Sequence, residues 1–281
     1  MFSGYADREP AERRRRLLQA DEIGLAQERQ SGERGPIDFG SLLQLSTLQY
    51  AKVVDSPLWL RLLGISGVMA LIVALGATLL AFPIAYFLAF RARHRAPLFL
   101  ILLLVPAATS FLMRVMAWKL LLGSSGAINS FLLWTGVIQE PIRLLLYSQA
   151  AVVITLIYVW TPFAALPIYG ALQRIDRSQL EAAADLGSGP WSRFWRVTIP
   201  LSLPGVLATF FMVFIPTVGE YVTPFLVGGT DGIMYGNLIQ DFFTRAGNWP
   251  LGSALAVIML VVTLALVGLA LRVVNLRRGV A

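Results

Sequence analysis

Residues 181–200 read EAAADLGSGPWSRFWRVTIP and separate two apolar runs, at 150–172 and 201–226. Each run exceeds the roughly 20 residues that a helix needs to cross a membrane. The segment between them starts with charged and small residues, passes through a glycine turn and ends in an amphipathic stretch. A loop of this composition between two spans predicts an all-α polytopic membrane protein with a surface made for a partner.

Composition and hydropathy extend this prediction to the whole chain. Of its 281 residues, 57% are hydrophobic and 14% charged, with a mean hydropathy of +0.69, whereas soluble domains are about 25% charged. Five apolar runs are long enough to span, at 62–90, 98–122, 150–172, 201–226 and 251–274. We expect one membrane domain over 57–281, preceded by a polar, Arg-rich segment over 1–56 that lacks the apolar region of a signal peptide.

Several kinds of chemistry are excluded by residues that the chain lacks. It has no cysteine and one histidine, His94, so thiolate sites, metal sites and Ser-His catalysis are not expected. Its lysines, Lys52 and Lys119, are followed by Val53 and Leu120, which rules out a phosphate-binding GxxxxGK[ST] loop. The chain is therefore expected to be no enzyme and to carry no cofactor, and an intramembrane enzyme is the weakest alternative.

The basic residues indicate orientation. The net charge is +7, which could indicate nucleic acid, but in a membrane protein it usually reflects the positive-inside rule. Arginines follow the first, third and fifth runs: Arg91, Arg93, Arg95, Arg174, Arg177, Arg193, Arg196, Arg272, Arg277 and Arg278. We place these three segments in the cytoplasm and expect no nucleic-acid partner. Five spans would then put the N-terminal segment outside, which its basic cluster at 13–16 opposes, and the sequence leaves this conflict open.

The first part of the quoted loop is expected to be a short helix. Ser178 followed by Glu181 fits a capping box, so the helix should begin near Gln179. Gly187, with Gly189 and Pro190 after it, should end the helix, because glycine tolerates positive φ and proline cannot donate the next hydrogen bond.

The second part is expected to be another helix with two unlike faces. Trp191, Phe194, Trp195 and Ile199 recur at helical spacing, while Arg193 and Arg196 point elsewhere. Such a helix could lie on the inner leaflet of the membrane or dock in the groove of a soluble partner. Small residues beside Glu181 and a glycine break at Gly187 favour the partner, since a lipid surface requires neither.

The complete spacing resembles the EAA loop of binding-protein-dependent ABC importer permeases, on Glu181, Ala182, Ala183, Gly187, Val197, Ile199 and Pro200. The resemblance implies a type I ABC importer transmembrane domain with about five spanning helices and a cytoplasmic coupling helix in the loop 175–200. It also implies that Glu181, Ala182, Ala183, Asp185, Gly187, Arg193 and Pro200 dock on an ATP-binding subunit. The implied partners are two such subunits that bind ATP and Mg, an unlike second permease, an extracytoplasmic solute-binding protein and lipid, in a bacterial inner membrane.

Other blocks look like the spermidine/putrescine permease subunits of that family. They include MRVMAW, SGAINSFLLWTGVIQEPIRLLL, VGEYVTPFLVGG and IMYGNLIQDFFTRAGNWPLGSALAVIML, and the likeness runs over about 48–274. This implies import of polyamines or related small amines by alternating access. Permeases for opines, aminobutyrate or other amino compounds share these blocks and stay open as an alternative.

A substrate pathway is predicted around Glu220, about nineteen residues into the fourth run. A carboxylate at membrane depth costs roughly 2.5–3.5 kcal/mol, so it is normally paired or lines a wet path. Pairing with Arg114 and contact with a cationic cargo are both open, and Tyr221, Trp118 and Asp241 are expected at the same outer level. An ion-coupled secondary transporter would also use such a carboxylate, but it would give the EAA-spaced loop no purpose.

Overall fold

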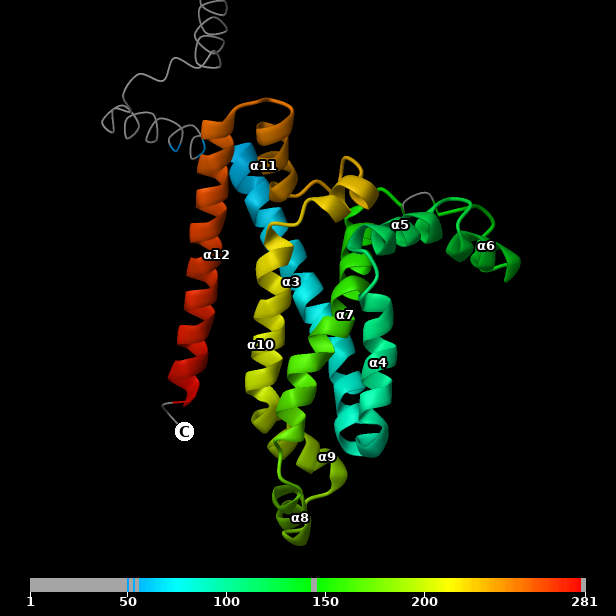
Figure 1. Ribbon diagram of the computed structural model, residues 1–281, viewed down its shortest axis with the longest axis vertical. Coiled ribbons are helices and arrows are strands. Elements are labelled where there is room, and N and C mark those ends of the chain that lie inside the picture. The colour runs from blue at the N-terminus through cyan, green and yellow to red at the C-terminus, as the bar shows by residue number, and fades with distance from the viewer. Residues whose placement is uncertain (1–49, 51–52, 54–55, 143–145, 279–281) are drawn as a thin grey trace, which may run out of the picture. The chain divides into compact units, whose positions relative to one another are not determined.

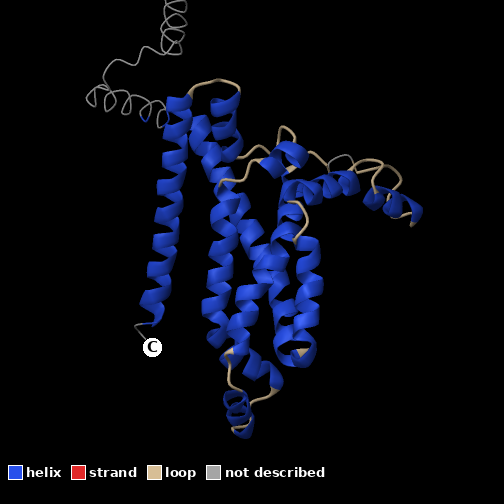
Figure 2. Ribbon diagram, viewed as in Figure 1, coloured by secondary structure: helices blue, strands red, loops and turns tan. Residues whose placement is uncertain are grey.

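The computed structural model describes residues 50, 53, 56–142 and 146–278. The predicted polar segment 1–56 therefore lies outside the described residues, apart from Tyr50, Val53 and Ser56. Every regular element in the described part is helical (Figure 2). The helices are α3 (Pro57–Tyr86), α4 (Ala96–Ala107), α5 (Phe111–Leu122), α6 (Ala127–Trp134), α7 (Gln149–Gln173), α8 (Arg177–Asp185), α9 (Pro190–Arg193), α10 (Ile199–Val218), α11 (Tyr235–Thr244) and α12 (Trp249–Arg278).

Three π-helical segments and one 3₁₀ turn complete the described part. The π-helical segments η1 (Phe87–Arg91), η4 (Phe194–Thr198) and η5 (Pro224–Gly228) adjoin longer helices, and the 3₁₀ turn η2 (Arg93–Arg95) precedes α4. π-helical turns are rare and occur frequently at functional sites.

Five helical stretches in the described residues are long and apolar enough to cross a membrane, as the sequence predicts. They are Pro57–Arg91, Phe111–Trp134, Gln149–Gln173, Pro190–Val218 and Trp249–Ala270. The prediction of one continuous span over 98–122 is wrong, because the chain leaves helical geometry at Ser110. α4 ends at Ala107, directly after Pro106, and Figure 1 shows α4 running along the bundle while α5 and α6 lie across one end of it.

The helices alternate in direction, and this places the arginine-rich connections together. The turn between α3 and α4, the α8–α9 loop and the C-terminal end of α12 lie at one end of the bundle (Figure 1). We call this the inner end, because basic connections mark the cytoplasmic side. The outer end carries α5, α6 and α11. The predicted grouping of the arginine-bearing segments is therefore confirmed.

The core lies between α3, α7 and α10. Along α3 the buried positions are mostly alanine, at Ala70, Ala74, Ala77, Ala81 and Ala85. Small side chains let transmembrane helices approach closely, which compensates for the missing hydrophobic drive inside lipid. At the crossing of α10 with α7, a Cβ on Gly205 would come 2.8 Å from the Pro167 carbonyl oxygen, so only glycine fits.

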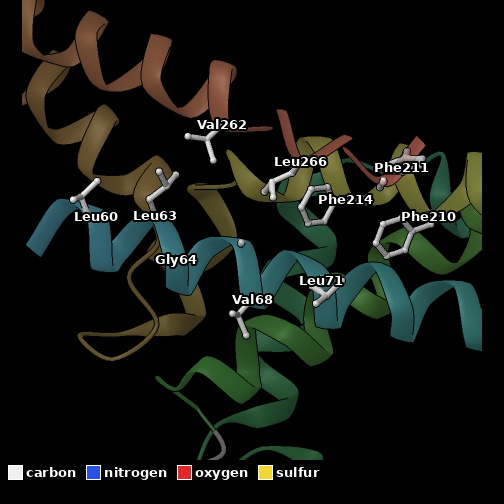
Figure 3. Close-up of a pocket in the computed structure, with 12 residues that line it drawn as sticks. Leu60, Leu63, Gly64, Val68, Leu71, Phe210, Phe211, Phe214, Val262 and Leu266 are labelled. Carbon is white, nitrogen blue, oxygen red and sulfur yellow. The ribbon is translucent and has the colours of Figure 1, made fainter. Parts of the chain in front are cut away.

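Helix α12 stands apart from this core along much of its length (Figure 1). Its outer end packs through Leu251, Ala254 and Leu255 against Tyr235. Further inward, a groove of about 520 Å³ separates it from α3 and α10. Figure 3 shows this groove lined by aliphatic and phenylalanine side chains, among them Leu63, Phe214 and Leu266. A wall of this kind suits the membrane interior and offers no carboxylate to a cationic cargo.

Candidate functional site: the coupling segment and the outer cluster

Helix α8 is the first limb of the quoted loop, and an aspartate caps it. The Asp176 side chain accepts a hydrogen bond of 3.0 Å from the Ser178 backbone N–H, and the helix begins at Arg177. The predicted cap at Ser178 and start near Gln179 are therefore wrong by two residues. Asp176 has extended backbone angles just before the first turn, which lets its carboxylate reach an unpaired amide there. Ser178 is left inside the helix.

Gly187 ends α8 as predicted. Its φ is +78°, a conformation that residues with a side chain rarely adopt. The Gly187 N–H donates to the Ala184 carbonyl at 2.8 Å and the Ser188 N–H to the Ala183 carbonyl at 3.0 Å. These two bonds form a Schellman motif, which satisfies carbonyls left open at the helix end.

The second limb differs from the separate helix that the sequence predicts. α9 passes through η4 into α10 without a break, so Pro190–Val218 is one helical stretch that enters the membrane. Phe194 and Ile199 both have right-handed helical angles at the junctions. Pro200 is the second residue of α10, which follows η4 directly, so inside the continuous stretch its missing N–H removes one helical hydrogen bond. A movement of α9 is therefore passed directly to α10.

The two limbs are fastened to each other and to the bundle. Arg193 on α9 donates from Nη1 to the Leu180 carbonyl oxygen on α8 at 3.5 Å and is half-buried. Arg193 thus turns toward α8. Leu180 packs against the edge of the main core, so the loop is held in one orientation.

The remaining loop surface is open. Glu181, Ala182 and Asp185 are exposed, Ala183 is half-buried, and α8 has no buried residue. Leu186 is 87% exposed and Trp191 73% exposed. Large apolar side chains beside carboxylates, on a rigid projection at the inner end, are typical of a protein-protein contact with aromatic anchors.

At the outer end, Glu220 has a role that the sequence did not indicate. α10 ends at Val218, so Glu220 follows the helix and does not lie inside it as predicted. Its Oε1 accepts hydrogen bonds from the backbone N–H groups of Val222 at 2.9 Å and Thr223 at 3.1 Å. Glu220 therefore caps the turn that leads into η5.

The predicted pairing of Glu220 with Arg114 is not formed. Arg114 on α5 donates to the Val159 carbonyl oxygen at 3.4 Å and lies 5.8 Å from the centre of the Phe163 ring. Trp118, one turn further along α5, packs on Tyr158 with ring centres 5.4 Å apart. Both side chains hold α5 against α7, and the salt bridge found among the described residues joins Arg245 and Asp241 instead.

Helix α11 packs closely on the segment after α10. Asn237 donates to the Tyr221 carbonyl oxygen at 2.8 Å and accepts from the Met234 N–H at 3.0 Å. The Tyr235 N–H donates to Ser66 Oγ on α3 at 2.7 Å, and burial raises the pKa of the Tyr235 phenol to about 12, so it stays neutral. The sequence did not indicate roles for Asn237 and Ser66, because their bonds to the Tyr221 carbonyl and the Tyr235 N–H depend on how the chain folds.

The predicted pathway residues thus form separate groups at the outer end. Glu220 and Tyr221 belong with α11, Arg114 and Trp118 belong to the α5–α7 contact, and Asp241 is engaged with Arg245. The described residues contain no group of metal-ligating side chains. The site that the structure builds most completely is the α8–α9 loop at the inner end, Arg177–Arg193, which we call the coupling segment.

Comparison with known proteins agrees with this architecture. The family model described as binding-protein-dependent transport system inner membrane component matches residues 48–278. The spermidine/putrescine transport system permease protein PotB of Escherichia coli (strain K12) is 38% identical over 213 residues, 76% of this chain and 77% of that protein. PotB of Haemophilus influenzae is 35% identical over 222 residues, 79% of this chain and 74% of its own length.

A solved structure shares the fold. It is the crystal structure of a bacterial ABC transporter involved in the import of the acidic polysaccharide alginate. The TM-score is 0.65 at 14% identity, over 93% of this chain and 96% of the matched chain. An ABC importer transmembrane domain therefore has the same helical arrangement.

Proposed function

The chain belongs to the family of binding-protein-dependent transport system inner membrane components, and from this premise we propose that it imports spermidine, putrescine or related small amines by alternating access. It is a multi-pass inner-membrane permease subunit of an ABC importer, which is a transport subunit and not an enzyme. The cargo, the partner subunits and the roles of single residues are the parts that we propose.

The observation that carries the proposal is the exposed, capped α8–α9 projection at the inner end. Glu181, Asp185 and Leu186 present carboxylates and an apolar side chain to solvent. Asp176 and Gly187 fix the two ends of the helix, and Arg193 fastens it to α9. α8 has no buried residue, so its two ends and its bond to α9 hold an exposed helix in place. We infer that this exposed helix docks on an ATP-binding subunit.

The energy for transport has to come from other subunits. Neither lysine of the chain stands in a GxxxxGK[ST] loop, so ATP and Mg would be bound by two ATP-binding subunits. A second, unlike permease would complete the route, and an extracytoplasmic solute-binding protein would deliver the cargo. Closure of the ATP-binding subunits would then move α9, and the continuous helix would transmit this movement to α10.

The proposed cargo rests on the relatives and on outer-end chemistry. The PotB proteins of Escherichia coli and Haemophilus influenzae are spermidine/putrescine permeases by name. At the outer end of this chain, Asp241 provides a carboxylate and Tyr221 an exposed ring. Protonated amines are attracted by both kinds of group. Opines, aminobutyrate and other amino compounds remain the second candidate, because their protonated amine nitrogen offers similar chemistry.

An ion-coupled mechanism loses the observation that suggested it. A proton or ion site needs a carboxylate free to change its partner, whereas Glu220 Oε1 accepts two backbone hydrogen bonds. The structure of the outer end supports a capping role for Glu220. We therefore infer that an ATP-binding subunit, acting on α8–α9, drives transport.

Reconstitution tests the proposal. The tagged chain is purified with its co-purifying subunits, placed in proteoliposomes with ATP inside and supplied with its binding protein and radiolabelled putrescine or spermidine outside. We expect ATP-dependent accumulation that a Gly187→Val variant loses and a Gly189→Ala variant keeps. Uptake that needs a proton gradient and no ATP would refute the proposal. Uptake of radiolabelled aminobutyrate in place of polyamine would select the second candidate.

A further inference from the structure

Besides its chain connection to α7 and the packing of Leu180 on the core, the coupling segment joins the bundle at two places that differ in kind. One is covalent, since α9 continues through η4 into α10. The other is a contact with α3, which is far away in sequence. There the Phe194 ring meets Phe82 with centres 5.9 Å apart and Tyr86 with centres 5.8 Å apart, both edge to face.

Phe194 also joins the exposed aromatic surface of the loop. The Trp191 ring stacks on it at 5.8 Å with an angle of 20° between planes, and the Trp195 ring meets it edge on at 5.4 Å. Trp191 and Trp195 are exposed while Phe194 is half-buried. Among the described rings, Phe194 is the one that contacts both the exposed pair and α3. A partner that pushes on the tryptophans therefore pushes on α3 through this ring.

The backbone on both sides of this contact has an uncommon geometry. Phe194 begins the π-helical segment η4, and Tyr86 directly precedes the π-helical segment η1. Pro83 lies between the two α3 residues that Phe194 touches, and it removes a backbone donor from that turn. Helices kink at prolines and at π-helical turns, and π-helical turns occur frequently at functional sites. The inner end of α3 therefore has a proline and a π-helical turn next to its contact with Phe194, where the helix can change its bend.

We propose that Phe194 is a positioning residue that carries the movement of the coupling segment to α3, while the continuous helix carries it to α10. This inference rests on the proposed function, because it needs an ATP-binding subunit on α8–α9. Two helices of the core would then respond together to one docking event. Without the ring, the loop and α10 would still move, and α3 would not follow.

The test measures the two movements separately. The chain contains no cysteine, so pairs of spin labels can be introduced at exposed positions. Gln179→Cys with Leu264→Cys reports the loop against α12, and Leu79→Cys with Leu264→Cys reports α3 against α12. Distances are measured in the assembled complex before and after trapping with ATP and vanadate, together with ATP hydrolysis and uptake in proteoliposomes.

In Phe194→Ala we expect the loop distance to change as in the unmodified chain, and the change on α3 to fall to less than half. Cargo moved per ATP hydrolysed should fall at least tenfold. Phe194→Tyr keeps a ring and should restore both quantities. Phe99→Ala is the matched control, since Phe99 packs on Phe87 of η1 at 5.8 Å from the α4 side and should leave the coupling intact.

Each outcome has a distinct meaning. An unchanged α3 movement in Phe194→Ala would overturn the relay and leave the proposed function standing. No movement of the loop in the unmodified chain would overturn the proposed function itself. If Phe194→Ala fails to assemble, Phe194→Leu replaces it, and a full α3 movement in that variant would equally refute a role for the ring.

Discussion

Replacing Gly187 by alanine should loosen α8 and leave the membrane bundle unchanged. At φ +78° a side chain costs about 1–2 kcal/mol. A Cβ there would have nothing within 4 Å, so the whole cost falls on the backbone of the helix end. α8 has nine residues, none of them buried, and isolated helices of this length are marginal in water. A loss of 1–2 kcal/mol corresponds to about a 5–30-fold change in the ratio of folded to unfolded helix.

Amide hydrogen exchange is the direct assay for this effect. Exchange of the amides of residues 182–188 should accelerate by about 5–30-fold in Gly187→Ala, and by more in Gly187→Val, because a β-branched side chain is worse at positive φ. Amides of α7 and α10 should be unaffected. Gly189→Ala is the matched control, since Gly189 has a φ of −65° and a Cβ there also has open space. Equal exchange in the two alanine variants would refute the reasoning.

Three further substitutions test the outer end and the core. Glu220→Ala should leave the Val222 and Thr223 amides uncapped, lower the free energy of unfolding by about 1 kcal/mol and lower uptake. Glu220→Gln keeps an acceptor and should retain most uptake. Equal uptake by the unmodified chain and both variants would show that the cap is dispensable. Gly236→Ala places a Cβ 2.6 Å from the Gly219 carbonyl oxygen and should destabilise the chain by about 1–3 kcal/mol, seen as a lower thermal midpoint in detergent. Asp241→Asn removes an exposed i,i+4 pair and should change stability by less than about 0.5 kcal/mol, so a large loss on denaturation would indicate an unrecognised role.

The sequence predicted best those features that depend on local rules. Apolar length gave the number of spans, and arginine positions gave the common inner end, because bilayer thickness and charge asymmetry act on any chain. Gly187 could be assigned because a helix end with positive φ selects glycine. Asp176 was missed in favour of Ser178 since both residues are good caps, and two residues is a common error for a helix boundary.

Features that depend on tertiary contacts were not predictable from one chain. The break at Ser110 follows from packing of α5 on α7 through Arg114 and Trp118, which lie in an apolar run that reads as continuous. Glu220 could be recognised as costly in a membrane, yet its capping role depends on where α10 ends. The turn of Arg193 toward Leu180 similarly depends on the angle between α8 and α9.

Site-specific cross-linking tests the central claim most directly, namely that α8–α9 docks on an ATP-binding subunit. Single cysteines are placed at Leu186, which is 87% exposed at the inner end, and at Trp134, which is 82% exposed on α6 at the outer end. Native membranes are treated with a maleimide that carries a photoreactive diazirine, which reacts with any neighbouring side chain on illumination, and the cross-linked partner is identified by mass spectrometry. We expect a cross-link from Leu186→Cys to an ATP-binding subunit and none to that subunit from Trp134→Cys. Failure of Leu186→Cys to capture an ATP-binding subunit in a membrane that transports the cargo would contradict it.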